Sequence, residues 1–218
     1  MSDSDRLLIH EIFTSIQGES TFTGLRCTFV RTASCNLRCR WCDTPQARCG
    51  GSAMSRRQVV EQALSGGTLL VVVTGGEPLL QQAVLPLMVA LCDAGRTVLL
   101  ETNGSRDISV VDRRVHRIMD LKAPGSGQQD HNRLANLKHL TGRDELKFVL
   151  ADRGDYEWMQ QTISDHGLDQ RGVPLLVTCV TGELEPRQLA AWVLADRLDV
   201  RLQVQLHKII WGPDATGV

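Results

Sequence analysis

The sequence has few aromatic residues, no long apolar run and almost no net charge. Phe, Trp and Tyr make up 4% of its 218 residues, which argues against a surface that stacks the bases of a single-stranded nucleic acid. The 24 basic and 25 acidic side chains are mixed along the chain and give a net charge of −1, so no basic tract predicts nucleic-acid binding. The longest apolar runs, such as residues 69–73, are far too short to span a membrane.

Residues 1–5 are mostly polar and acidic, unlike the start of a secretion signal. The seven cysteines therefore predict free thiols in a reducing cytoplasm rather than a framework of disulfides. The length predicts one domain over residues 1–218, large enough to bury a substantial core. We expect a cytoplasmic protein that binds neither nucleic acid nor membrane.

Strand-like and helix-like segments alternate along the chain, which predicts βα units and a mainly parallel sheet. Six or seven strands in 218 residues are too few for a comfortable closed eight-stranded barrel. We therefore predict an α/β fold, a partial (open) parallel αβ barrel of six to seven strands. After a strand-like opening at 7–16, the predicted strands are 27–33, 69–74, 98–101, 117–121, 145–150, 174–178 and 201–206. The helix-like segments are 55–64, 81–94, 133–140, 155–166 and 186–194. Ser55 and Gln58 have the spacing of a capping box at the start of the first.

Three cysteines, Cys35, Cys39 and Cys42, fall within eight residues, so their thiolates can converge on one centre. Iron–sulfur clusters are normally held by four cysteines, and three from a single loop would leave one iron open to another ligand. Structural zinc takes four protein ligands, and Cys49 or Cys27 could supply the fourth. The triplet predicts a metal site and leaves the metal undecided.

A glycine-rich turn, Gly75-Gly76-Glu77-Pro78, directly follows the apolar run of residues 69–74. Two glycines allow a ligand to approach the backbone closely, and successive amides can bind a carboxylate. Glu77 could hold an amine or stabilise the turn. Alternatively, the four residues form only a tight connection between a strand and a helix.

The cysteine loop followed by this turn resembles the radical S-adenosylmethionine superfamily. Over about residues 8–211, a longer set of motifs resembles the 7-carboxy-7-deazaguanine synthase family within it. These motifs are Ser15-Ile16-Gln17-Gly18-Glu19, Phe29-Val30-Arg31, Cys35-Asn36-Leu37, Cys42-Asp43-Thr44, Thr74-Gly75-Gly76-Glu77-Pro78, Glu101-Thr102-Asn103-Gly104, Asp144-Glu145-Leu146-Lys147 and Gln205-Leu206-His207-Lys208.

The resemblance implies a partial αβ barrel that binds a 4Fe-4S cluster, S-adenosyl-L-methionine and Mg²⁺. It implies a carbon–nitrogen lyase of queuosine biosynthesis, which contracts 6-carboxy-5,6,7,8-tetrahydropterin to 7-carboxy-7-deazaguanine and releases ammonia. It also implies a homodimer and an external electron donor similar to flavodoxin or ferredoxin. Two alternatives stay open, a radical activase that acts on a protein substrate and a non-enzymatic zinc-binding module.

The resemblance also implies roles for individual residues. The cluster ligands would be Cys35, Cys39 and Cys42, and the magnesium ligand would be Thr44. S-adenosylmethionine would be bound by Trp41, Asp43, Gly76, Glu77, Asp120, Lys122 and Thr178. The substrate would be bound by Ile16, Gln17, Gly18, Glu19, Arg31, Thr74 and Glu101.

Several of these residues have simpler interpretations. Trp41 could be a core residue, and Asp120 with Lys122 could form a surface ion pair. Arg31 suits a substrate carboxylate because guanidinium binds carboxylates bidentately, but it could instead pair with Glu19 or Asp43. A Thr-Pro pair at Thr44 indicates only a turn. The sequence does not decide whether His207 and Lys208 close the site or end a solvated strand, and it assigns no role to the tail 212–218.

Overall fold

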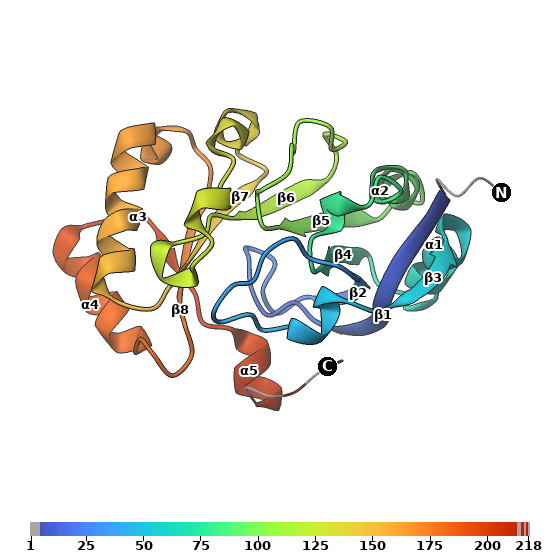
Figure 1. Cartoon of the computed structure of the whole chain (residues 1–218), viewed down its shortest axis with the longest axis horizontal. Coiled ribbons are helices and arrows are strands. Elements are labelled where there is room, and N and C mark those ends of the chain that lie inside the picture. The colour runs from blue at the N-terminus through green and yellow to red at the C-terminus, as the bar shows by residue number, and fades with distance from the viewer. Residues whose placement is uncertain (1–4, 213–214, 216, 218) are drawn as a thin grey trace.

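The computed structural model describes residues 5–212, 215 and 217, and its centre is one curved sheet of nine strands (Figure 1). From β2 to β9 all neighbours run parallel, whereas β1 lies antiparallel between β2 and β3. Among the described residues the edge strands β3 and β9 do not pair with each other, so the barrel is open, as predicted. In sheet order the strands are β3 (Ser52–Ser55), β1 (Arg6–Ile16), β2 (Arg26–Thr32), β4 (Leu70–Gly75), β5 (Thr97–Thr102), β6 (His116–Asp120), β7 (Glu145–Leu150), β8 (Leu175–Cys179) and β9 (Arg201–Leu202).

Helices cover the outer face of this sheet. In Figure 1, α1 (Arg56–Ser65) and α2 (Val84–Asp93) lie beside the first strands, and α3 (Arg153–His166) and α4 (Pro186–Asp196) lie beside the last. The predicted capping box at the start of α1 is confirmed, because the Ser55 side chain accepts from the Gln58 amide and the Gln58 side chain accepts from Ser55.

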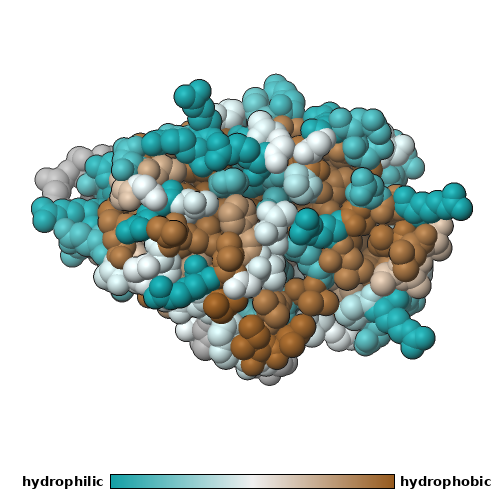
Figure 2. Space-filling model, turned by 180° about the vertical axis from the view of Figure 1, so that it is seen from behind, coloured by the Kyte–Doolittle hydropathy of each residue, from teal (hydrophilic) through white to brown (hydrophobic). Residues whose placement is uncertain are grey.

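Two predicted elements differ from the structure. Residues 133–140 form only a 3-10 helix, Leu134–His139. The strand predicted over 201–206 ends after two residues, and α5 (Leu206–Trp211) begins where a strand was expected. The reason is that this segment bonds to the loop after β1 instead of to a strand: the Leu206 amide donates to the Gly18 carbonyl at 3.0 Å. α5 exposes Ile209 and Ile210, and Figure 2 shows a hydrophobic patch at the lower edge of the molecule, where α5 lies in Figure 1.

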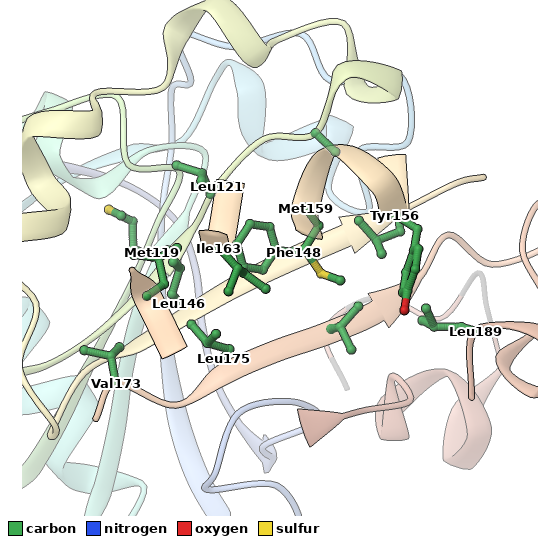
Figure 3. Packing of buried hydrophobic residues seen from close by; sticks show 14 of the residues in the cluster. Met119, Leu121, Leu146, Phe148, Tyr156, Met159, Ile163, Val173, Leu175 and Leu189 are labelled. Atoms are coloured by element: carbon green, nitrogen blue, oxygen red, sulfur yellow. The ribbon is translucent and has the colours of Figure 1, made fainter. Parts of the chain in front are cut away.

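Apolar side chains on the outer face of the sheet form the core beneath the helices. Because side chains alternate between the two faces of a strand, every second residue of β7 points toward α3. Figure 3 shows one of them, Phe148, beside Met159 and Ile163 of α3. A second cluster joins Val71 and Val73 of β4 to residues of α1 and α2.

The inner face of the sheet changes from apolar to polar along the strands. Above a layer of apolar side chains lie Arg31 of β2, Thr74 of β4 and Glu101 of β5, all toward the carboxyl ends of their strands. The apolar layer consists of Cys27, Phe29, Leu70, Val72, Leu99 and Ile118. The polar groups therefore stand over an apolar floor, which is where parallel barrels build their sites.

Candidate active site

A cavity of about 270 Å³ opens above this floor, and a second of about 410 Å³ adjoins it. The two share a wall that includes Trp41, Cys42 and Asp43. All but two of the predicted site residues line the first cavity: Ile16, Gln17, Gly18, Glu19, Arg31, Cys35, Cys39, Trp41, Cys42, Asp43, Thr44, Thr74, Gly76, Glu101, Asp120 and Lys122.

The cysteine loop crosses one side of this cavity between β2 and β3. The Leu37 amide donates to the Cys35 sulfur at 3.4 Å, a contact of the kind that tunes the sulfurs of iron–sulfur clusters. Arg48 donates to the Cys39 carbonyl at 3.0 Å and fixes the middle of the loop. Burial raises the pKa of Cys39 and thereby favours its neutral thiol. Binding of a metal ion would replace the proton and give the thiolate.

A fourth cysteine that would complete a zinc site is not in place. Cys27 lies in the apolar floor, where burial raises its pKa to about 12, and Cys49 is exposed and lines neither cavity. In the part of the chain that the structure describes, no three His, Cys, Asp or Glu side chains are grouped to hold a single metal ion. An iron–sulfur cluster does not require such a group, because it contains several irons and each cysteine can bind a different one.

The glycine turn packs directly against the cysteine loop. Gly75 has φ +136°, a conformation that favours glycine. A Cβ on Gly76 would lie 2.8 Å from the Cβ of Cys35, too close for any side chain to fit. Only glycine therefore lets the end of β4 approach the first cysteine this closely.

Two predicted site residues lie elsewhere. Glu77 is fully buried in the turn, where its carboxylate accepts from the Asn103 amide at 2.7 Å and from the Thr102 hydroxyl. Burial raises its pKa even though these hydrogen bonds oppose the shift. Its position matches the turn-stabilising role that the sequence left open. Thr178 is buried within β8, and its neighbour Cys179 lines the second cavity instead.

Four neighbouring charged side chains line the cavity. Lys122 lies 2.9 Å from Asp120, and Lys147 lies 2.7 Å from Glu19 and 3.7 Å from Asp120. These side chains are 14–17% exposed, so Asp120 and Lys122 do not form a surface pair. Burial disfavours the charge on Asp120, but the two ammonium groups outweigh it and lower its pKa. For Lys147 the carboxylates likewise overcome burial and raise the pKa.

Arg31 and Glu101 also line the cavity. Arg31 donates from Nε to Glu11 at 2.7 Å, so its protein partner is Glu11 and the predicted alternatives, Glu19 and Asp43, are wrong. Gln17 and Thr74 each donate to one oxygen of Glu101, at 3.1 and 2.7 Å. Both charged groups are thus held in a fixed orientation by neighbours.

The segment of residues 203–211, which we call the C-terminal strap, closes the cavity from the open side of the sheet. Gln205 and Lys208 donate to Asp43 at 2.9 and 2.6 Å. The imidazole of His207 packs so closely on Gly18 that no Cβ would fit there. His207 and Lys208 both line the cavity, which answers the question that the sequence left open. Of the tail beyond the strap, the structure describes Gly212, Ala215 and Gly217, and the other positions lie outside the described residues.

Comparison with known proteins agrees with this arrangement. The model of the Radical SAM superfamily matches residues 29–164. A 7-carboxy-7-deazaguanine synthase of Chlorobaculum tepidum is 48% identical over the full length of both chains. Another, of Koribacter versatilis, is 44% identical over 96% of this chain and 99% of its own. This chain belongs to the 7-carboxy-7-deazaguanine synthase family.

The fold agrees with that assignment. The crystal structure of QueE from Escherichia coli superposes with a TM-score of 0.76 and covers 93% of this chain and 95% of its own, at 22% identity. The Streptococcus suis enzyme SuiB bound to S-adenosylmethionine gives a TM-score of 0.59 at 14% identity over 80% of this chain and 48% of its own. Within the described residues, no helix is long and apolar enough to cross a membrane.

Family membership makes the chain a radical S-adenosylmethionine lyase of deazapurine biosynthesis, with a 4Fe-4S cluster and S-adenosylmethionine as cofactors. The zinc module and the protein-activating enzyme are thereby set aside. The residues present fit both cofactors: three cysteines line one cavity, and the glycine turn beside Cys35 leaves backbone accessible to a ligand. Lys147, Asn103, Gln205 and Glu11 also line this cavity, although the sequence did not single them out as ligand-binding residues.

Proposed function

We propose that this chain binds 6-carboxy-5,6,7,8-tetrahydropterin above the apolar floor and contracts it to 7-carboxy-7-deazaguanine, with release of ammonia. One observation carries the proposal: Arg31 and Glu101 stand in the same polar layer of one cavity, on β2 and β5. The substrate has a carboxylate on one side and a guanidine-like edge on the other. A guanidinium and a carboxylate on two walls match these two groups.

Arg31 would bind the substrate carboxylate. Its Nε is taken by Glu11, and this contact orients the planar guanidinium while its two terminal nitrogens remain for a bidentate contact. The side chain is 15% exposed, so the contact would form in a largely water-free site. There a charge-assisted hydrogen bond is stronger than in water.

Glu101 would accept hydrogen bonds from the guanidine-like nitrogens of the pterin. Gln17 and Thr74 hold its two oxygens, and each oxygen keeps a further lone pair for the substrate. Phe29 and Ile118, from the floor of the cavity, would support the ring from below. The substrate would thus be fixed at both ends before any bond breaks.

The cofactors would occupy the side of the cysteine loop. Cys35, Cys39 and Cys42 would hold three irons, and the polar groups of S-adenosylmethionine would meet Gly76, Asp120 and Lys122. When bound, the reduced cluster and S-adenosylmethionine supply the carbon radical that takes a hydrogen atom from C6 of the substrate. The protein positions the reacting atoms and excludes water, for which the C-terminal strap is well placed.

Five finer expectations belong to this proposal. Thr44 would bind a Mg²⁺ ion together with the substrate, since magnesium takes few protein ligands beside substrate oxygens. A carrier similar to flavodoxin or ferredoxin would deliver the electron. The chain would act in the cytoplasm, where thiols stay reduced. It would form one domain over residues 1–218 and pair as a homodimer.

An anaerobic assay with two substrates tests the proposal. Reconstituted protein would receive S-adenosylmethionine, Mg²⁺, a reductant and either the 6-carboxytetrahydropterin or the same pterin without its carboxylate, and mass spectrometry would follow the products. We expect 7-carboxy-7-deazaguanine from the first and no deazapurine from the second. Cleavage of S-adenosylmethionine without any deazapurine from the first would overturn the substrate assignment.

A further inference from the structure

Lys147 is a buried cation that family resemblance gave no role. It lies on the inner face of β7, directly opposite Asp120 of β6 in the register of the sheet. Its side chain is 16% exposed and lines the cavity. A lysine is rarely buried unless it is paired, so its partners explain its position.

The partners of Lys147 come from two distant parts of the sheet. Its Nζ lies 2.7 Å from Glu19 and 3.7 Å from Asp120. Asp120 ends the neighbouring strand, whereas Glu19 follows β1, which is separated from β7 by β2, β4, β5 and β6 in the sheet order. One ammonium therefore spans the interior of the open barrel.

Both carboxylates keep unused acceptor capacity. Glu19 Oε1 and Asp120 Oδ1 are buried and have no hydrogen-bond partner among the described residues. The other oxygen of Glu19 accepts from Lys147, and the other oxygen of Asp120 lies 2.9 Å from Lys122 and 3.7 Å from Lys147. A ligand hydroxyl or amino group could satisfy the free oxygens after a small rotation of the side chain.

We propose that Lys147 is a positioning residue that couples the substrate half of the cavity to the cofactor half. It holds Glu19 toward the pterin and Asp120 toward S-adenosylmethionine. This inference rests on the proposed function, because that function assigns Glu19 to one ligand and Asp120 to the other. Lys147 itself touches neither ligand.

The proposal makes a specific demand on three substitutions. Glu19→Gln should weaken mainly the binding of the substrate, and Asp120→Asn should weaken mainly the binding of S-adenosylmethionine. Lys147→Met should weaken the binding of both ligands, because this one side chain orients both carboxylates. Lys138→Met, the same change at an exposed lysine, is the matched control.

Two measurements on reconstituted protein test this demand: the Kd of S-adenosylmethionine by calorimetry and the KM of the pterin. For Lys147→Met we expect both constants to rise about tenfold or more, a loss of about 1.4 kcal/mol for each ligand, while Lys138→Met changes neither. A protein that only loses stability would show a lower Tm with both constants unchanged, and that result would overturn the proposal. A rise in only one constant would also overturn it.

A second variant keeps the test decisive if Lys147→Met does not fold. Lys147→Gln is uncharged but can still donate hydrogen bonds to a carboxylate, so both constants should rise, by less than in the methionine variant. If neither rises, the proposal fails. Failure of the proposed function would be recognised separately, because the unaltered protein would then form no deazapurine. The Kd of S-adenosylmethionine could still be compared between the unaltered protein and the variants.

Discussion

The three cysteines of the loop differ from Cys49 in what surrounds them. Cys35, Cys39 and Cys42 line the cavity. The Leu37 amide donates to the Cys35 sulfur, and Arg48 donates to the Cys39 carbonyl. Cys49, seven residues after Cys42, is exposed to solvent. The same chemical change at these positions should therefore have opposite consequences for the cluster.

We expect Cys39→Ser to abolish cluster retention and all cleavage of S-adenosylmethionine, because an iron would lose its thiolate ligand. Cys49→Ser should keep the iron content and brown colour of the unaltered protein. Iron and sulfide analysis after anaerobic reconstitution checks both. Full iron content in the Cys39 variant would contradict the ligand assignment.

Arg31 allows a test of substrate recognition at a single residue. Loss of its bidentate contact in Arg31→Lys should raise the KM of the pterin about tenfold or more, with the Kd of S-adenosylmethionine unchanged. Steady-state kinetics and calorimetry measure the two. Arg57→Lys, at an exposed arginine on α1 paired with Glu61, serves as the control. An unchanged KM would remove Arg31 from the substrate site.

Among the elements, α1 tests whether local capping stabilises the fold independently of the site. Ser55 caps the helix through its reciprocal bonds with Gln58 and lines neither cavity. Ser55→Ala should lower the free energy of unfolding by about 1 kcal/mol and leave the affinity for S-adenosylmethionine unchanged. Urea denaturation measures the free energy of unfolding. Ser52→Ala, at an exposed position in the same strand, should change neither.

Two side chains attach the C-terminal strap to the cysteine loop. Lys208 and Gln205 hold it to Asp43, beside the last cysteine of the loop. Lys208→Met should speed hydrogen exchange of the α5 amides, because the variant lacks the ion pair with Asp43. The short helix could then open without breaking that contact. Exchange followed by mass spectrometry checks this, with Lys138→Met again as control. Exchange as slow as in the unaltered protein would show that other contacts hold the strap.

Sequence patterns predicted the elements better than their contacts. The alternation of apolar segments gave the parallel strands, and Ser55 with Gln58 gave the start of α1. The pairing of β1 with β2 was not foreseen, and it is this antiparallel register that sets Glu11 opposite Arg31. Lys147 was missed as a site residue because nothing local distinguishes a buried lysine in a strand from an exposed one. The helix α5 replaced a predicted strand because its contacts lie nearly 190 residues away, with Gly18.

At the scale of the whole molecule, the pair of Arg117 with Asp144 links β6 to the start of β7. The pair is buried, at 10% and 1% exposed, with 2.6 Å between its closest atoms. Burial alone would raise the pKa of Asp144, but the hydrogen bonds from Arg117 and Thr141 outweigh it and lower the pKa. The resulting stabilisation is fully present above the ordinary carboxyl pKa of about 4. It is lost as the pH falls through the lower pKa of the folded state.

Arg117→Met should therefore destabilise the fold by about 3–5 kcal/mol at neutral pH, because it leaves a buried carboxylate unpaired. The difference from the unaltered protein should shrink as the pH falls below about 4, since protonated Asp144 no longer needs a cation. Denaturation curves at several pH values measure it. A difference that stays constant with pH would contradict the ionic role of the pair.

The central claim is that one cavity holds the pterin and S-adenosylmethionine side by side, with C6 of the substrate facing the cofactor. Substrate deuterated at C6 tests this most directly, under anaerobic turnover with unlabelled S-adenosylmethionine. Deuterium should appear in S-adenosylmethionine recovered after turnover, together with 7-carboxy-7-deazaguanine. Cleavage that yields only unlabelled 5′-deoxyadenosine, and no deazapurine, would contradict the account.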